Sequence, residues 1–295
     1  MTQDITNFKK WLLAARPKTL PAAAAPVITG GAVAFCDGSV SSLIFIAALA
    51  GAFLLQIAVN LANDYFDYKH DIDTDERLGP IRVTQSGLIR PGTVRNAMLL
   101  VLSIALTIGL WLITIGGLPI LIIVIASLVC TLCYSGGPYP IASNGLGELF
   151  VFIFFGPVAV CGTYYLLSGT LTPNTVIASV PIGFLITAIM IVNNLRDIVT
   201  DAKAGKRTLA VMLGTPGTKT LYFFLVLTSY LIPALMFALG TYDFSILLPI
   251  VSMPLSIPLL QSISEQKGRL LNKTLAGTAR LSLVYSILFS LGFLL

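Results

Sequence analysis

The sequence predicts an all-α, polytopic membrane protein with about nine transmembrane helices, and three observations support this prediction. Hydrophobic residues make up 56% of the 295 residues and charged residues only 11%, against roughly 25% charged residues in an ordinary soluble domain. The apolar residues form runs of about 17–25, the length that a helix needs to cross a bilayer. The basic residues are restricted to alternate connecting segments. We expect residues 1–295 to form a single transmembrane domain.

The apolar runs define the expected helices in chain order. Pro21 and Pro26 lie in the first run and predict a bend there, because proline interrupts the hydrogen bonds of a helix. Gly116, Gly117 and Pro119 lie between the third and fourth runs and predict a tight hairpin turn. The nine expected spans are residues 17–36, 43–63, 97–115, 118–135, 147–167, 175–195, 221–239, 244–261 and 279–295.

The distribution of charge predicts how these helices are oriented. All 18 Lys and Arg residues lie on one side, in the inside segments or within about two residues of a span's inner end, which is a strong positive-inside pattern. We therefore expect a multi-pass protein of the cell (inner) membrane, with the N-terminus cytoplasmic and the C-terminus on the outer side. The net charge of +5 reflects this topology and contact with anionic headgroups, so it does not indicate a nucleic acid partner. The inside segments are residues 1–16, 64–96, 136–146, 196–220 and 262–278.

Two of the inside segments contain the same pattern of amides and carboxylates. The matching residues are Asn63, Asp67 and Asp71, and, at a constant offset of 130, Asn193, Asp197 and Asp201. Residues at i, i+4 and i+8 share one face of a helix, so each helix would present an amide and two carboxylates at the membrane boundary. Carboxylates at this spacing repel one another, and an unpaired acid beside hydrocarbon is expensive. A bound divalent cation would relieve this repulsion.

The repeated pattern favours magnesium, a hard ion that is commonly held by a few carboxylates together with substrate phosphates. A diphosphate also needs positive charge from the protein, and Arg82 and Lys206 follow the two acidic clusters among small or turn residues. Glu148 opens the fifth span, where the N-terminus of a helix favours an acid. A structural role and a substrate contact both remain open for Glu148.

The aspartate clusters resemble the motifs of a known family. Asn63-Asp64-x-x-Asp67-x-x-x-Asp71 resembles the first aspartate motif of the UbiA superfamily of intramembrane aromatic prenyltransferases, and Asp197-x-x-x-Asp201 is similar to the second. The resemblance covers essentially the whole chain. It implies a UbiA-type bundle with a cytoplasmic-side active site that joins a polyprenyl diphosphate to an aromatic acceptor in contact with membrane lipid, with Mg²⁺ as cofactor.

The resemblance also implies roles for individual residues of this chain. The implied metal ligands are Asn63, Asp67, Asp71, Asp197 and Asp201, and the four aspartates among them are the implied catalytic residues. The implied substrate-binding residues are Asn60, Asp64, Arg82, Asn193, Lys206 and Lys18.

Within the superfamily, the sequence is most similar to the branch whose acceptor is 1,4-dihydroxy-2-naphthoate. In that branch the prenyl chain replaces the ring carboxylate, so that diphosphate and carbon dioxide leave and demethylmenaquinol forms for menaquinone biosynthesis. The branch that uses 4-hydroxybenzoate usually has a basic pair after a Tyr-Pro, whereas Tyr139-Pro140 is followed here by residues 141–144 without a base. The strings that carry the similarity are Arg16-Pro17-Lys18-Thr19-Leu20-Pro21, Asn60-Leu61-Ala62-Asn63-Asp64-Tyr65, residues 145–152 and Asn193-Asn194-Leu195-Arg196-Asp197.

Two alternatives to this interpretation stay open. The acceptor could be 4-hydroxybenzoate, homogentisate or a tetrapyrrole, in which case the mechanism would be the same. The protein could also be a membrane transporter, because intramembrane acids and internal repeats are common in carriers. The acids lie at the inner boundary and no charged residue lies in the middle of a span, which favours the enzyme.

Overall fold

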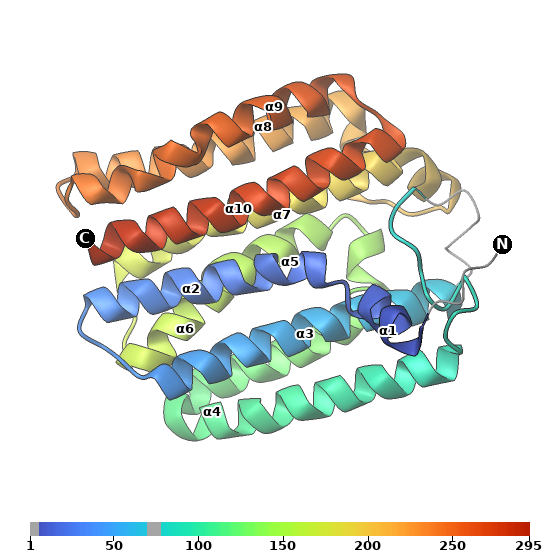
Figure 1. Ribbon diagram of the computed structural model, residues 1–295, viewed down its shortest axis with the longest axis horizontal. Coiled ribbons are helices and arrows are strands. Elements are labelled where there is room, and N and C mark those ends of the chain that lie inside the picture. Colours follow the sequence, from blue (N-terminus) through green and yellow to red (C-terminus); the bar gives the residue numbers. More distant parts are fainter. Residues whose placement is uncertain (1–5, 70–77) are drawn as a thin grey trace.

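The computed structural model describes residues 6–69 and 78–295, and within these residues it contains helices and no β-strand. Helix α1 and the C-terminus lie at opposite ends of an elongated bundle (Figure 1), as expected for an odd number of crossings. The α-helices are α1 (Asn7–Ala15), α2 (Leu20–Cys36), α3 (Ser42–Lys69), α4 (Pro91–Cys133), α5 (Gly147–Ile153), α6 (Ala159–Ser168), α7 (Pro173–Lys203), α8 (Leu209–Ala238), α9 (Met253–Glu265) and α10 (Leu271–Leu294).

Helix α4 contains two membrane crossings. Eight helical segments of the described chain are long and apolar enough to span a membrane, and α4 is one of them with 43 residues. A straight helix of that length would measure about 65 Å, roughly twice the hydrocarbon thickness. Gly117 interrupts the helix with φ 61° and ψ −144°, and a Cβ atom added to Gly109 would lie 2.9 Å from a methyl group of Val124. The two arms therefore pack against each other as a hairpin, which confirms the predicted turn and gives nine crossings in the described residues.

The break in the first span lies earlier than the prolines predicted. Arg16 adopts a left-handed conformation with φ 52° and separates α1 from a short 3₁₀ turn, Pro17–Thr19, and α2. Pro21 lies in the first turn of α2, where its missing N–H is not needed. Pro26 lies inside α2, which continues to Cys36.

The interior of the bundle is centred on α7, which packs against α8, α10 and α2. Its buried residues join one large apolar cluster with residues of those helices and of α6, including Ile182, Tyr222 and Tyr285. Helix α3 packs on α4 at the other side of the bundle. Large apolar side chains on the outer surface, such as Leu100, Ile122 and Leu231, remain exposed, as expected for a surface that faces lipid. The protein is therefore an integral membrane protein.

The span that contains α5 and α6 has an irregular centre. Residues Phe154–Val158 form a π-helical turn around Pro157, which has no N–H to donate to the helix. In this turn Gly156 approaches α7 so closely that an added Cβ atom would lie 3.1 Å from the Cα atom of Gly183. The close crossing brings the start of α5 next to the inner part of α7.

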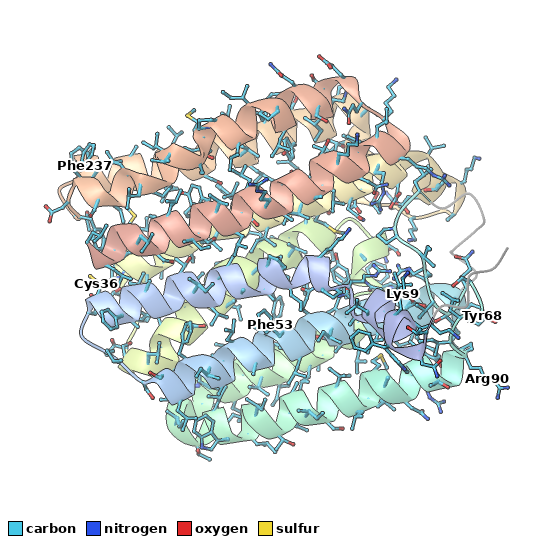
Figure 2. All side chains as sticks on the ribbon, in the orientation of Figure 1. Lys9, Cys36, Phe53, Tyr68, Arg90 and Phe237 are labelled. Carbon is cyan, nitrogen blue, oxygen red and sulfur yellow. The ribbon has the colours of Figure 1, made fainter. Side chains whose placement is uncertain are left out.

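Polar and charged side chains gather at the end of the bundle where α1 lies. Figure 2 shows Lys9, Tyr68 and Arg90 at this end, whereas Cys36 and Phe237 lie at the opposite end. The C-terminal ends of α3 and α7, which carry the two repeated motifs, also lie at the end of the bundle where α1 lies.

Candidate active site

The two repeated motifs meet at one cavity of ≈ 510 Å³. Asn63 and Asp67 reach it from α3, and Asn193, Asp197 and Asp201 reach it from α7. Asp67 and Asp201 lie close enough to interact electrostatically. The structure therefore brings together five of the six residues of the repeated pattern, while Asp71 lies outside the described residues.

On α3, Asp67 forms a buried ion pair with Arg82, in which Nη2 of the guanidinium donates to Oδ2 of the carboxylate. Arg82 also lines the cavity. The loop that carries Arg82 contacts the C-terminal part of α3 through this ion pair. Arg82 therefore lies beside Asp67 at the cavity, and its predicted contact with a diphosphate stays a prediction.

Asp64, next to Asn63 on α3, is bonded to the loop that carries Arg82. Its two carboxylate oxygens accept hydrogen bonds from the backbone N–H groups of Val83, at 3.0 Å, and Thr84, at 2.9 Å. The side chain is 1% exposed, and Asp64 is absent from the residues that line the cavity. Asp64 therefore holds the loop that presents Arg82, and its predicted role in substrate binding stays a prediction.

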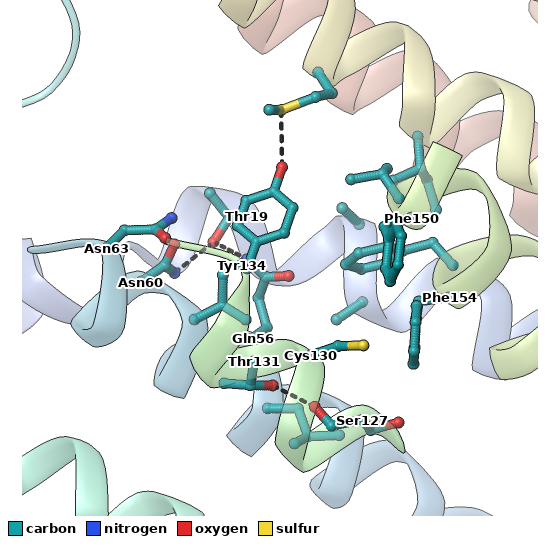
Figure 3. A pocket seen from close by; sticks show the side chains of 18 of the residues that line it. Thr19, Gln56, Asn60, Asn63, Ser127, Cys130, Thr131, Tyr134, Phe150 and Phe154 are labelled. Carbon is teal, nitrogen blue, oxygen red and sulfur yellow. Dashed lines mark hydrogen bonds between the residues drawn. The ribbon is translucent and has the colours of Figure 1, made fainter. Parts of the chain in front are cut away.

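Two amides of α3 lie beside Asp67, and Figure 3 shows both. Asn60 donates from Nδ2 to the carbonyl oxygen of Ala15, at 3.0 Å, and to Oγ1 of Thr19, at 2.9 Å. Asn60 therefore ties the junction of α1 and α2 to α3, and this junction places Arg16 and Lys18 at the cavity. The Oδ1 atom of Asn63 is buried and has no hydrogen-bond partner in the described part of the chain.

On α7, Arg196 organises the second motif. Its guanidinium donates to both oxygens of Asp197, at 2.8 and 2.5 Å, and to Oδ1 of Asn193, at 2.9 Å. It also donates to Oδ1 of Asn272 on α10, at 2.9 Å, and Arg196 is 3% exposed. Sequence reasoning missed this role, although Arg196 lies inside the motif string itself.

The third acid of the cavity also has a basic partner. Lys206 Nζ lies 3.5 Å from Oδ1 of Asp201. Among the described residues, each of the three acids that line the cavity, Asp67, Asp197 and Asp201, is therefore paired with a base. These ion pairs reduce the repulsion between the carboxylates that the motif spacing predicts.

The donor set nevertheless fits a hard divalent cation. No group of three or more His, Cys, Asp or Glu side chains close enough to hold a metal occurs in the described residues. The cavity does offer carboxylate oxygens on two facing helices and the unpartnered amide oxygen of Asn63. Oxygen ligands of this kind, completed by substrate phosphates, are those that Mg²⁺ prefers.

An aromatic wall lines the cavity next to the acids. Figure 3 shows Tyr134 between the amides of Asn60 and Asn63 and the rings of Phe150 and Phe154. The two phenylalanine rings are stacked at a centroid distance of 6.2 Å. The carboxylates of Glu148 and Asp67 act electrostatically on the phenol of Tyr134. Tyr134 is thus located close to both carboxylates.

Away from the acids the cavity is apolar. It extends between α2, α3, the α4 hairpin and α6. Its deeper lining includes Gly51, Leu112, Ile120 and Leu166, and the last three belong to a separate buried apolar cluster. The arrangement can hold an amphipathic ligand, with anionic groups at the acids and bases and an apolar chain between the helices.

Comparison with known proteins agrees with this arrangement. The profile of the UbiA prenyltransferase family matches residues 23–287. A 1,4-dihydroxy-2-naphthoate octaprenyltransferase of Haemophilus influenzae is 36% identical over 98% of this chain and 97% of its own. A protein of the same description from Escherichia coli is 32% identical over 99% of this chain and 97% of its own. The structure of a UbiA homolog from Archaeoglobus fulgidus bound to DMAPP and Mg²⁺ has a similar fold, with a TM-score of 0.62 at 17% identity over 95% of this chain and 99% of that one.

Proposed function

The chain belongs to the UbiA prenyltransferase family, and we propose that it transfers a polyprenyl chain to 1,4-dihydroxy-2-naphthoate in menaquinone (vitamin K2) biosynthesis. The bond between the allylic carbon and the diphosphate oxygen breaks, and its electron pair leaves with diphosphate. The allylic carbon then bonds to the ring carbon that bears the carboxylate. The carboxylate leaves as carbon dioxide and its electron pair restores the aromatic ring, which gives demethylmenaquinol.

The observation that carries this proposal is the convergence of the two motif helices on one cavity with an apolar extension. A polyprenyl diphosphate has the same division into an anionic head and a long apolar chain. The names of the curated relatives support the naphthoate as acceptor. The absence of a base in residues 141–144, after Tyr139-Pro140, argues against a benzoate acceptor.

The proposed metal ligands are Asn63, Asp67, Asp71, Asp197 and Asp201. Bound Mg²⁺ would neutralise the negative charge that develops on the diphosphate oxygens as the carbon–oxygen bond breaks. The unpartnered oxygen of Asn63 supports this ligand set.

The diphosphate also meets basic residues of the chain itself. Arg82, Lys206 and Lys18 line the cavity and are the proposed diphosphate contacts, because basic side chains neutralise phosphate oxygens through charge-assisted hydrogen bonds. Asn193 and Asn60 line the same region. The apolar part of the cavity would hold the prenyl chain and exclude water from the reacting carbon.

The proposed location is the inner membrane, with the end of the bundle that carries the acids at the cytoplasmic face. The N-terminus is then cytoplasmic and the C-terminus lies on the outer side. The concentration of basic residues in the segments at the acidic end supports this orientation.

Prenyl transfer by the purified protein in lipid vesicles tests the proposal. The assay supplies a long-chain polyprenyl diphosphate with carboxylate-labelled 1,4-dihydroxy-2-naphthoate or 4-hydroxybenzoate, with Mg²⁺ or excess chelator. We expect a prenylated naphthoquinol and labelled carbon dioxide with the naphthoate alone, and no product with chelator. Product with the benzoate alone would overturn the acceptor, and no product with either, from protein that binds the polyprenyl diphosphate, would overturn both acceptors.

Variants connect the activity to the two motifs. Asp67→Ala and Asp197→Ala should each lower turnover by about a hundredfold or more, which is the effect of removing one group that stabilises developing charge. Asp243→Ala is the matched control, because Asp243 is an exposed acid outside the cavity. Near-normal turnover by either cavity variant would contradict a site shared by α3 and α7.

A further inference from the structure

A buried hydrogen bond joins the start of α5 to the second motif. Nδ2 of Asn194 donates to Oε1 of Glu148 at 2.7 Å. Asn194 is 3% exposed and Glu148 is 4% exposed. Asn194 lines the cavity, whereas Glu148 lies behind it. The proposed roles of the aspartates, Arg82 and Lys206 do not account for this pair.

The chemistry of the pair fixes the orientation of the Asn194 amide. An amide side chain has an NH₂ donor and a carbonyl acceptor, and a carboxylate oxygen accepts hydrogen bonds. Because the NH₂ group faces Glu148, the oxygen of Asn194 is the atom that can serve a ligand in the cavity. No hydrogen bond from a residue of the described chain reaches this oxygen. A buried acceptor that faces a cavity is stabilised when a ligand donates to it.

The walls near Asn194 suit a flat aromatic ring. Tyr134 lies close to Glu148, and its hydroxyl group lies 3.5 Å from Sδ of Met190, one turn before Asn194 on α7. Phe150 faces the same cavity, one turn after the start of α5. Aromatic rings and a thioether provide a polarisable apolar surface on which a ring can pack.

We infer that this corner of the cavity is the binding site for the aromatic acceptor, and that the Oδ1 atom of Asn194 accepts a hydrogen bond from one ring hydroxyl. Glu148 is a positioning residue, since it holds the Asn194 amide in the orientation that presents the oxygen. Asn194 follows Asn193 and lies one turn before Asp197 on α7, and all three line the same cavity, so the ring would lie beside the diphosphate site. This inference rests on the proposed function, because it assumes a dihydroxylated aromatic acceptor.

Two analogues that each lack one hydroxyl group test the inference as competitive inhibitors. They are 1-hydroxy-2-naphthoate and 4-hydroxy-2-naphthoate, and their inhibition constants against 1,4-dihydroxy-2-naphthoate are measured with the wild-type protein and with Asn194→Ala. For the wild-type protein, we expect one of the two analogues to bind about 5- to 100-fold more weakly than the other, the effect of one hydrogen bond to a buried acceptor. In Asn194→Ala the two analogues should bind with the same affinity, within about twofold, and the KM for polyprenyl diphosphate should change less than that for the acceptor.

Glu148 variants separate positioning from general stability. Glu148→Ala should lose the discrimination between the analogues as Asn194→Ala does, because the amide can then turn. Glu148→Gln keeps an oxygen that accepts from Asn194 and should retain most of the discrimination. Thr187→Val is the control, because Thr187 is buried on the same helix, lies outside the cavity and donates its hydroxyl only to the carbonyl oxygen of Gly183, one turn earlier.

Several outcomes would overturn the inference. They are equal binding of both analogues by the wild-type protein, unchanged discrimination in folded Asn194→Ala, and discrimination lost equally in Thr187→Val. If Asn194→Ala does not fold, loss of discrimination in folded Glu148→Gln would also count against the inference. By contrast, wild-type protein that prenylates another acceptor and makes no product with the naphthoate would overturn the proposed function.

Discussion

Replacing Asp64 by asparagine tests whether this acid acts on the ligand or on the loop that presents Arg82. In the structure the two Asp64 oxygens accept from two consecutive backbone N–H groups, at 3.0 and 2.9 Å, and the side chain is 1% exposed. Asparagine can keep one of these bonds, but its NH₂ group would face the other N–H. The substitution therefore removes one buried hydrogen bond to a charged group, which is worth about 1.5–3 kcal/mol.

This loss of free energy should lower kcat/KM, because the loop carries Arg82 beside the cavity. If the loop is ordered less often, fewer molecules present the guanidinium at Asp67. A cost of about 1.5–3 kcal/mol corresponds to roughly a 10- to 150-fold decrease in kcat/KM. We expect the decrease in steady-state assays that vary polyprenyl diphosphate, while the Mg²⁺ concentration for half-maximal rate changes less than about threefold.

Two comparisons decide between the roles of Asp64. Asp67→Asn, which alters a proposed metal ligand, should raise the Mg²⁺ requirement. The double variant Asp64→Asn with Arg82→Ala should be little worse than Arg82→Ala alone, because both changes remove the same contribution. If Asp64→Asn instead raises the Mg²⁺ requirement as strongly as Asp67→Asn, Asp64 acts on the metal and the positioning argument is wrong.

Two further predictions concern α7 and the apolar part of the cavity. Arg196→Ala removes the hydrogen bonds of a buried guanidinium to the partly exposed carboxylate of Asp197, a loss of about 1.5–3 kcal/mol. The thermal midpoint measured by intrinsic fluorescence should therefore fall by roughly 3–12 °C, and an unchanged midpoint would contradict the role given to Arg196. Gly51 lines the cavity and a Cβ atom there would meet nothing within 4 Å, so Gly51→Leu should fold and extend into the space proposed for the prenyl chain. In competition assays Gly51→Leu should lower kcat/KM for a long polyprenyl diphosphate by about tenfold or more relative to a two-isoprene one, since pocket contacts of this size are worth 1–3 kcal/mol. Gly92→Leu, at an exposed position outside the cavity, should leave the ratio of the two kcat/KM values unchanged. If Gly51→Leu and Gly92→Leu give the same ratio, the prenyl chain does not lie beside Gly51.

The sequence predicts the features of this protein that depend on local periodicity. Runs of apolar residues predict the crossings, and the glycines at 116 and 117 predict the hairpin that the structure confirms. Spacing of four residues predicts that Asn63 and Asp67, and likewise Asn193 and Asp197, reach a common side of their helices, and they line one cavity. Their roles as ligands remain a prediction, as does the role of Asp71, which lies outside the described residues.

The features that depend on long-range contacts could not be read from the sequence. Asp64 and Asp67 are the same residue type in the same motif and only three residues apart, but Asp67 lines the cavity while both oxygens of Asp64 accept hydrogen bonds from the backbone of a loop some 20 residues later, at Val83 and Thr84. The contact of Asn194 with Glu148 joins residues 46 positions apart. The contact of Arg196 with Asn272 joins residues 76 positions apart. The left-handed conformation of Arg16 has no local signal comparable to a glycine, since residues other than glycine rarely adopt it.

The three ion pairs of the cavity have a thermodynamic consequence for how ligands enter. Each acid already holds a base, so Mg²⁺ that arrives alone must separate acids from bases and leave buried positive charge behind, which is costly. Diphosphate that arrives alone must likewise separate the bases from the acids and leave negative charge behind, which is also costly. When both arrive together, acids and bases exchange partners and no charge is left uncompensated. Metal and diphosphate should therefore increase each other's affinity by the same factor, as linkage requires, so we expect the site to bind each ion weakly alone and the neutralised pair tightly.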